Sequence, residues 1–219
     1  MSPIKPRKPK QRSLLPQQKV DPLAFERRLA EQGYTSIAGV DEAGRGCLAG
    51  PVVAASVILP QDLIIEGLKD SKQLSAKKRD EMYDRVCESA LAWSWSAVDA
   101  PEIDRINILQ ATLLAMRESV KKLRVVPNFI LIDGRDTIQS SIPQKAISKG
   151  DVFSHSVAAA SVIAKVTRDR LMCDYAKSYP AFSFQVHKGY GTKLHLEELA
   201  QSKPTPLHRM TFRRVSPSS

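Results

Sequence analysis

Four carboxylic acids stand beside predicted strand ends, where together they could bind divalent metal ions. Two follow the β-rich run 35–40, one follows the apolar run 129–132, and one precedes a long helical pattern: Asp41, Glu42, Asp133 and Asp151, in that order. Ligands of open α/β sheets usually bind at such strand ends and their loops. Carboxylates that meet at one edge repel one another unless cations neutralise them. Because hard oxygen ligands suit Mg²⁺ or Mn²⁺, the pattern predicts a two-metal site.

Each acid taken alone also has an ordinary structural explanation. An Asp after a strand most often serves as a turn residue or a helix cap, and Asp–Glu pairs are common on solvated surfaces. Other acids, such as Asp70, Asp136 and Asp169, are also available, and spacing alone does not choose among them. The residue pattern therefore predicts a metal site without fixing its ligands.

The acids need a sheet to bring them together, and the hydropathy pattern predicts one. A short glycine-rich connection joins the first two strand-like runs, which favours an antiparallel hairpin. The two strand patterns of the hairpin come early, and strands and helices then follow in mixed order. This order predicts an α/β fold with a mixed central sheet flanked by helices. The strand patterns cover residues 35–40, 52–59, 91–98 and 129–132, and the helical patterns cover residues 23–32, 76–90, 101–123, 156–179 and 192–200.

Composition and charge exclude several classes of protein. The 219 residues carry 33 Lys and Arg against 23 Asp and Glu, a net charge of +10. No apolar run approaches the roughly 18 residues of a membrane span. Three dispersed cysteines without a C-x-x-C pair predict neither a disulfide framework nor a zinc site. We therefore expect a cytoplasmic protein in which residues 21–219 form a single domain, and nothing demands more than a monomer.

Most of the basic excess lies in residues 1–20. This segment holds six Lys or Arg residues, no acid and four prolines. Prolines at this density block helix and sheet, so the pattern predicts a disordered tail. A basic tail attracts polyanions such as nucleic acid, and the alternative is that it only aids solubility.

A series of motifs occurs in a fixed order over roughly residues 35–212. It opens with AGVDEAGRGCLAGPVVAA at 38–55. The later runs are DSKQLS at 70–75, IDG at 132–134, KGD at 149–151, AASVIAKVTRD at 159–169, HKGYGT at 187–192 and PLHR at 206–209. One such motif could arise by chance, but the ordered set is very specific. Together the runs closely resemble bacterial type 2 ribonuclease H, the ribonuclease HII family.

That resemblance implies a fold, a reaction and a set of catalytic residues. The fold is RNase H-like, and the reaction is endonucleolytic cleavage of the RNA strand of RNA–DNA hybrids and incision at single ribonucleotides embedded in duplex DNA. The products carry a 5′-phosphate and a 3′-hydroxyl, and two divalent ions, Mg²⁺ or Mn²⁺, serve as cofactors. The metal-binding catalytic acids implied are Asp41, Glu42, Asp133 and Asp151.

The resemblance also implies residues that bind the substrate. Gly44, Arg45 and Gly46 would contact the ribonucleotide, since glycines expose backbone N–H groups that can read a 2′-hydroxyl; a plain hairpin turn is the alternative. Tyr190 matches the tyrosine that packs on the sugar, with a buried loop anchor as the alternative. Lys72 matches a lysine near the scissile phosphate, or is a solvated charge before a helix.

Further polar side chains have two interpretations each. Lys165 and Arg168 share a helix face, which either lies along a phosphate backbone or makes salt bridges. Asn107 either contacts the DNA strand or is a capping, solvent-facing residue. His187 and His208 fall in matched motifs, and we expect both to be structural.

Two other classes of function compete with the ribonuclease. A basic nucleic-acid-binding protein could have this fold without catalysis, although the presence of all four acids disfavours it. Another metal nuclease of the same broad fold, resolvase-like or transposase-like, would cut DNA that contains no ribonucleotide.

Deleting residues 1–20 is expected to weaken duplex binding and to flatten its salt dependence, because each lost phosphate contact removes about one log unit of slope. The measurement is binding of the full and the shortened chain to a labelled RNA–DNA duplex across roughly 50 to 200 mM salt. An unchanged slope would reduce the tail to a solubility aid.

Overall fold

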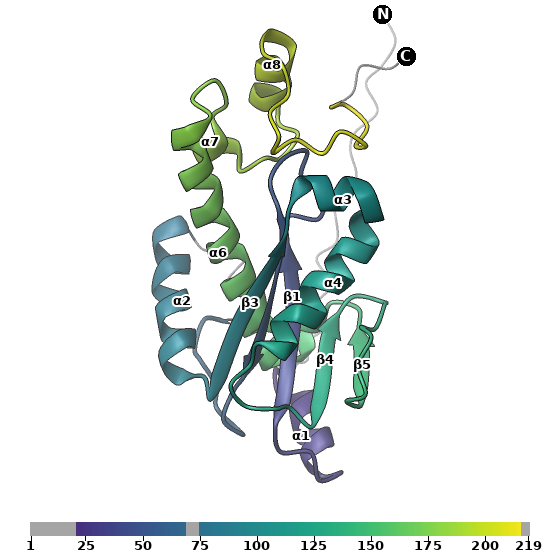
Figure 1. Cartoon of the computed structure of the whole chain (residues 1–219). Helices are drawn as coiled ribbons and strands as arrows, with labels where there is room; N and C mark the ends of the chain where they lie inside the picture. Colours follow the sequence, from purple (N-terminus) through teal and green to yellow (C-terminus); the bar gives the residue numbers. More distant parts are fainter. Residues whose placement is uncertain (1–20, 69–74, 216–219) are drawn as a thin grey trace, which may run out of the picture.

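A mixed five-stranded sheet forms the centre of the computed structural model, which describes residues 21–68 and 75–215 (Figure 1). The order across the sheet is β3-β2-β1-β4-β5, with β1, β2 and β3 antiparallel and β4 and β5 parallel to β1. The strands are β1 (Ile37–Ala43), β2 (Val52–Ile58), β3 (Ala92–Val98), β4 (Phe129–Asp133) and β5 (Gln144–Ile147). This confirms the expected mixed sheet and its opening hairpin. The predictions for the tail and for Lys72 fall outside the described residues.

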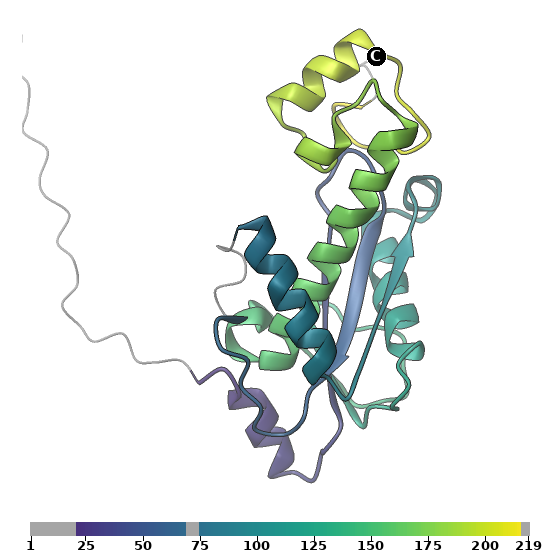
Figure 2. The ribbon, with the colours of Figure 1, turned by 90° about the vertical axis from the view of Figure 1, so that its left-hand side faces the viewer.

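Helices cover both faces of this sheet. The long helix α6 (His155–Ser178) crosses β1 and β2 beside α2 (Ala76–Ser89), and α4 (Ile108–Lys121) covers β2 and β3 from the other side (Figures 1 and 2). All seven residues of β2 are buried because helices lie on both of its faces. The remaining helices are α1 (Ala24–Ala30), α3 (Ala100–Ile106), α5 (Gly150–Phe153), α7 (Phe184–His187) and α8 (Lys193–Gln201). None of the helices that the structure describes could span a membrane.

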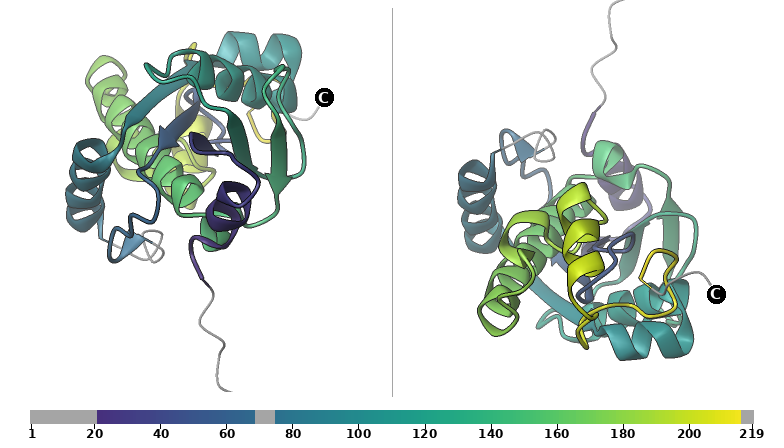
Figure 3. Two further views of the ribbon diagram at one scale, coloured as in Figure 1. Left: turned by 90° about the horizontal axis from the view of Figure 1, so that it is seen from below. Right: turned by 90° about the horizontal axis from the view of Figure 1, so that it is seen from above.

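The C-terminal part of the chain covers one end of the sheet. Viewed from above, α7, α8 and the following segment lie over the end to which β1 points (Figure 3). The 44–51 loop between β1 and β2 meets this layer directly, since the N–H of Leu48 donates to Gly189 O and that of Gly50 donates to Leu207 O, both at 2.8 Å. Segments far apart in the sequence therefore meet where β1 ends.

The single helix predicted over residues 101–123 is wrong, because Asn107 divides it. Asn107 has a φ of 70°, and its side chain accepts a hydrogen bond from the N–H of Gln110, so it caps the start of α4. Apolar side chains on both sides of the break pack into one core cluster, including Ile103, Ala111 and Ala115. The three–four hydrophobic spacing therefore continues through the break, and periodicity alone does not reveal it.

The pairing of β1 with β4 explains how the acids converge. These strands are parallel, and Val40 pairs with Ile132. The next residues are Asp41 and Asp133, which therefore leave neighbouring strands at the same level. Because successive side chains alternate between faces, both acids lie on the opposite face from Val40 and Ile132, which pack in the core on the α4 side. Asp41 and Asp133 consequently face α6.

A Gly39→Ala substitution is expected to destabilise the fold, because β1 and α6 approach too closely for a side chain there. A Cβ at Gly39 would overlap the backbone of Ser156 and Val157. The free energy of unfolding should fall by about 3 kcal/mol, the upper end of overpacking penalties, as measured by urea unfolding.

The matched control is Gly46→Ala, where a Cβ meets nothing within 4 Å and φ is not positive. Its free energy of unfolding should change by less than about 1 kcal/mol. Equal losses in the two variants would contradict the close approach of β1 and α6.

Candidate active site

Asp41 is the most deeply buried of the four acids. Only 4% of its surface is exposed. Its Oδ1 accepts a hydrogen bond from the N–H of Glu42 at 2.7 Å, and Ser161 on α6 also hydrogen-bonds the carboxylate. Burial, and then the charges of Glu42 and Asp133, raise the pKa of Asp41 well above its usual value. The surroundings thus disfavour the negative charge of this carboxylate, although two hydrogen bonds partly stabilise it.

Asp133 links the sheet edge to the segment that carries Asp151. Its Oδ1 accepts a hydrogen bond from the N–H of Gly150 at 2.8 Å, and Asp151 is the next residue, in the first turn of α5. Lys149 adopts a left-handed conformation, φ 61°, just before this turn. The bond to Gly150 therefore fixes where α5 starts, and with it the backbone of Asp151.

Three of the four acids line one cavity of about 400 Å³ with several of the expected substrate-binding residues. The fourth acid, Asp151, does not line this cavity, and neither does Gly46. The residues around it are Asp41, Glu42, Ala43, Gly44, Arg45, Arg79, Asp133, Ser161, Val162, Lys165 and Tyr190. The structure thus brings acids from β1 and β4 together with side chains from α2, α6 and the loop before α8.

The donor set suits a hard divalent cation, although its members are not gathered around one point. Within residues 21–68 and 75–215, no three His, Cys, Asp or Glu side chains are placed to hold a metal ion. Glu42 instead lies 3.8 Å from Arg45, between Oε1 and Nη1. The observation that fits a cation is Asp41, a buried carboxylate with two acidic neighbours, where positive charge would relieve both desolvation and repulsion.

Arg168 contradicts the prediction that, on the face it shares with Lys165, it meets a phosphate backbone or makes a salt bridge. It is fully buried, and its guanidinium donates to three carbonyl oxygens: Pro51 at 2.9 Å, Ala49 at 3.0 Å and Lys188 at 2.8 Å. Residues three or four positions apart share one face of a helix. On α6 this face lines the cavity at Lys165 but lies beneath the 44–51 loop at Arg168. Arg168 therefore positions backbone, and it is not exposed to a phosphate.

Arg209 is a second buried arginine that sequence reasoning left without a role. It donates to Gly44 O at 2.7 Å, Arg45 O at 2.9 Å and Gly50 O at 2.9 Å. Burial lowers the pKa of Arg209 to about 10. The only sequence signal was its place in the PLHR run.

The two arginines determine which way the glycine loop presents its peptide groups. In a trans peptide the N–H points opposite to the C=O. The carbonyls of Gly44 and Arg45 both point inward to Arg209. The N–H groups of Arg45 and Gly46 therefore point away from it, which is the orientation a ligand in front of the loop would need.

Tyr190 and Lys165 both reach the cavity, and they contact each other. Tyr190 is 39% exposed, and Lys165 Nζ lies 5.3 Å and the Arg168 guanidinium 5.8 Å from the centroid of its ring. Its hydroxyl hydrogen-bonds the buried Cys47 thiol, and burial raises the pKa of the phenol. Lys165 also makes the alternative salt bridge, to Asp169 at 2.7 Å. Asn107 is exposed at the start of α4 and does not line the cavity.

Arg79 and Ser161 are cavity residues that sequence reasoning missed. Lys77, Lys78 and Arg79 occupy the first turn of α2, where the helix dipole disfavours cations. This unusual placement of three basic residues was the one sequence feature that set Arg79 apart. Ser161 lay within a matched motif, but only the packing of α6 on β1 shows that it meets Asp41.

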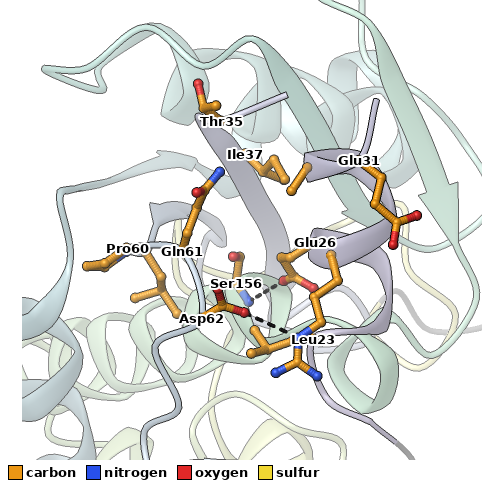
Figure 4. A pocket seen from close by; sticks show the side chains of 12 residues that line it. Leu23, Glu26, Glu31, Thr35, Ile37, Pro60, Gln61, Asp62 and Ser156 are labelled. Carbon is orange, nitrogen blue, oxygen red and sulfur yellow. Dashed lines mark hydrogen bonds and ion pairs between the residues drawn. The ribbon is translucent and has the colours of Figure 1, made fainter. Parts of the chain in front are cut away.

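A second cavity, of about 270 Å³, lies at the opposite end of β1, between α1 and the end of β2 (Figure 4). Glu26 sits in its wall and accepts hydrogen bonds from Ser154 Oγ at 2.7 Å and Ser156 N at 3.0 Å. This carboxylate therefore anchors the first turn of α6. None of the candidate site residues lines this cavity.

Comparisons with known proteins identify the family of the chain. The family model for Ribonuclease HII matches residues 38–215. Ribonuclease HII from Geotalea uraniireducens (strain Rf4) is 53% identical over 193 residues, covering 88% of this chain and 89% of the relative.

Two solved structures share the fold. The ribonuclease H2 from Pyrococcus horikoshii OT3 has a TM-score of 0.70 at 28% identity, covering 82% of this chain and 95% of that chain. Bst-RNase HIII in complex with Mn²⁺ has a TM-score of 0.68 at 20% identity, covering 85% of this chain and 70% of that one, and its likeness shows the fold alone. The extent of the family match and the identity to the bacterial relative confirm the resemblance read from the motifs: the chain belongs to the ribonuclease HII family and is a nuclease, a hydrolase of the ribonuclease H type.

Proposed function

We propose that the cavity beside Asp41 cleaves the RNA strand of RNA–DNA hybrids and incises duplex DNA at single embedded ribonucleotides. The observation that carries the proposal is the shared register of β1 and β4, which presents Asp41 and Asp133 side by side next to the glycine loop and Tyr190. Acids for hydrolysis and groups suited to a ribose thus line one cavity. The proposed products carry a 5′-phosphate and a 3′-hydroxyl.

The four acids are the proposed metal ligands. Asp41 and Asp133 would hold the ions from the sheet edge, Glu42 from the end of β1 and Asp151 from the first turn of α5. Two divalent ions, Mg²⁺ or Mn²⁺, would supply a lowered pKa for the attacking water and charge stabilisation for the leaving 3′ oxygen. For this, Glu42 must leave the side of Arg45, and Asp41 must be ionised.

The remaining cavity residues would recognise and hold the nucleic acid. The N–H groups of Arg45 and Gly46 are proposed to hydrogen-bond the 2′-hydroxyl and a neighbouring phosphate, which distinguishes RNA from DNA at the cut site. Tyr190 would pack on the sugar, and Lys165 and Arg79 would contact phosphates. Lys72 and Asn107 stay proposed substrate contacts from the family resemblance, and Arg168 would act only through the loop that it supports.

Incubation with a duplex that carries one ribonucleotide, in Mg²⁺ or Mn²⁺, is expected to give a single cut at that position. Asp133→Asn should lower the rate by roughly 10³-fold or more, since members of a catalytic set act together, while salt-sensitive binding persists. Gel analysis of the end-labelled strand measures both cut position and rate, and an all-DNA duplex is the control.

Each other outcome identifies a rival. Binding without cutting by the unaltered chain would favour a nucleic-acid-binding protein. Cutting of the all-DNA duplex would favour another metal nuclease, and full activity in Asp133→Asn would refute the ligand assignment.

Tyr190→Ala is expected to lower kcat/KM at a single ribonucleotide by roughly tenfold to a hundredfold, because aromatic stacking on nucleic acid contributes about 1–3 kcal/mol. Tyr190→Phe, which keeps the ring and loses the hydroxyl, is the matched control and should stay within about threefold of the unaltered chain. Unchanged cleavage in Tyr190→Ala would dismiss the stacking role.

A further inference from the structure

Three of the four histidines form a buried cluster behind Tyr190 that the proposed chemistry does not use. His187 ends α7, His195 lies in α8, and His208 lies in the segment that follows α8. All three are at most 4% exposed. The rings of His187 and His195 stack with centroids 4.1 Å apart, and those of His195 and His208 lie 5.2 Å apart.

Hydrogen bonds assign the protons on His208 and His195. His208 Nδ1 accepts from the N–H of Thr205 at 2.9 Å, so its proton resides on Nε2. His208 Nε2 donates to His195 Nε2 at 3.1 Å, which leaves the His195 proton on Nδ1. His195 Nδ1 then donates to the carbonyl oxygen of Tyr190 at 2.9 Å. A directed chain thus runs from Thr205 to the backbone of Tyr190.

His187 fixes the same loop from its other side. Its Nδ1 accepts from the N–H of Gly189 at 3.1 Å, and its Nε2 donates to Glu198 at 2.9 Å. Lys188 and Gly189 both have positive φ, 51° and 80°. A Cβ at Gly189 would overlap Ala49 O, so the turn is also pressed against the glycine loop. The residues leading into Tyr190 are therefore held between His187 and the glycine loop.

We propose that His187, His195 and His208 are positioning residues, which fix Tyr190 in the cavity through a chain of neutral imidazole rings. The inference rests on the proposed role of Tyr190 at the ribonucleotide. The histidines themselves do not line the cavity; they act through the backbone of the loop.

Each ring must be neutral, because each uses one nitrogen as an acceptor. Burial lowers the pKa of all three, that of His208 to about 4. Glu198 of α8 contacts the cluster through His187, and it also accepts from the N–H of Ser183 at 3.0 Å. Around the rings lie Phe182 and Phe184, with Tyr175 of α6 and Tyr179, which follows α6, beyond them in the same apolar cluster.

A pair of substitutions at His195 separates the bond to Tyr190 from simple packing. In His195→Asn the side-chain amide can take the place of Nδ1–H and donate to Tyr190 O. In His195→Gln the amide reaches toward Nε2, and the donor to Tyr190 O is lost. We expect His195→Gln to lower kcat/KM at a single ribonucleotide by roughly tenfold, and His195→Asn to stay within about threefold of the unaltered chain.

A double variant tests whether the effect passes through Tyr190. Combining His195→Gln with Tyr190→Ala should give the rate of Tyr190→Ala alone. Once the Tyr190 ring is removed, the position of its backbone no longer affects the reaction. Multiplied losses in the double variant, or equal losses in His195→Gln and His195→Asn, would overturn the proposal. Thermal unfolding of each variant shows whether it is folded.

If His195→Gln does not fold, the same comparison is made at His208. His208→Gln can retain the donor to His195, and His208→Asn retains the acceptor for Thr205 but loses that donor. Only His208→Asn should impair cleavage, and equal rates would refute the chain of rings.

The tests at Tyr190 and at His195 separate the two proposals. Normal cleavage by Tyr190→Ala would refute the proposed role of Tyr190. Impaired cleavage by Tyr190→Ala together with unimpaired cleavage by His195→Gln would refute only the positioning role of the histidines.

Discussion

Arg168 and Arg209 place two guanidinium groups beneath the 44–51 loop, and the arrangement of the cavity depends on them. A buried charge is costly unless its hydrogen bonds are satisfied. Both guanidinium groups donate hydrogen bonds to backbone carbonyls of this loop, and Arg168 also donates to that of Lys188. A Cβ at Gly44 would overlap the Arg168 side chain, so glycine is required there for packing as well as for its φ of 89°. The loop conformation is thus imposed from below.

The cavity joins two independently positioned halves. Backbone register in the sheet places Asp41 and Asp133, and the hydrogen bond from Gly150 ties α5 to the same edge. The other half is the glycine loop, which the arginines hold, and Tyr190, whose backbone the histidines hold. Backbone hydrogen bonds from Leu48 to Gly189 and from Gly50 to Leu207 join the two. Rigid support on both sides suits a reaction in which small displacements of the reacting groups are costly.

Much of this was accessible from the residues. The apolar runs predicted four of the five strands and the mixed sheet, but β5, with the polar sequence QKAI, carries too little hydrophobic signal to be found. The break at Asn107 escaped because the apolar spacing continues through it. For the site, the motifs singled out Asp41, Glu42, Gly44, Arg45, Asp133, Lys165 and Tyr190, which line one cavity, and they misplaced Arg168 because spacing on a helix does not give depth.

The sequence by itself determined the family, the fold class and the candidate acids, because ordered motifs and hydropathy are properties of the linear chain. Only the tertiary structure decided which carbonyls the two arginines bind, that Asp41 and Asp133 share a face, and that His195, itself bonded to His208, hydrogen-bonds the backbone of Tyr190. The arginine contacts to the 44–51 loop join residues more than a hundred positions apart, such as Arg209 and Gly44. Direction and depth of a side chain arise from packing, and no local pattern encodes them.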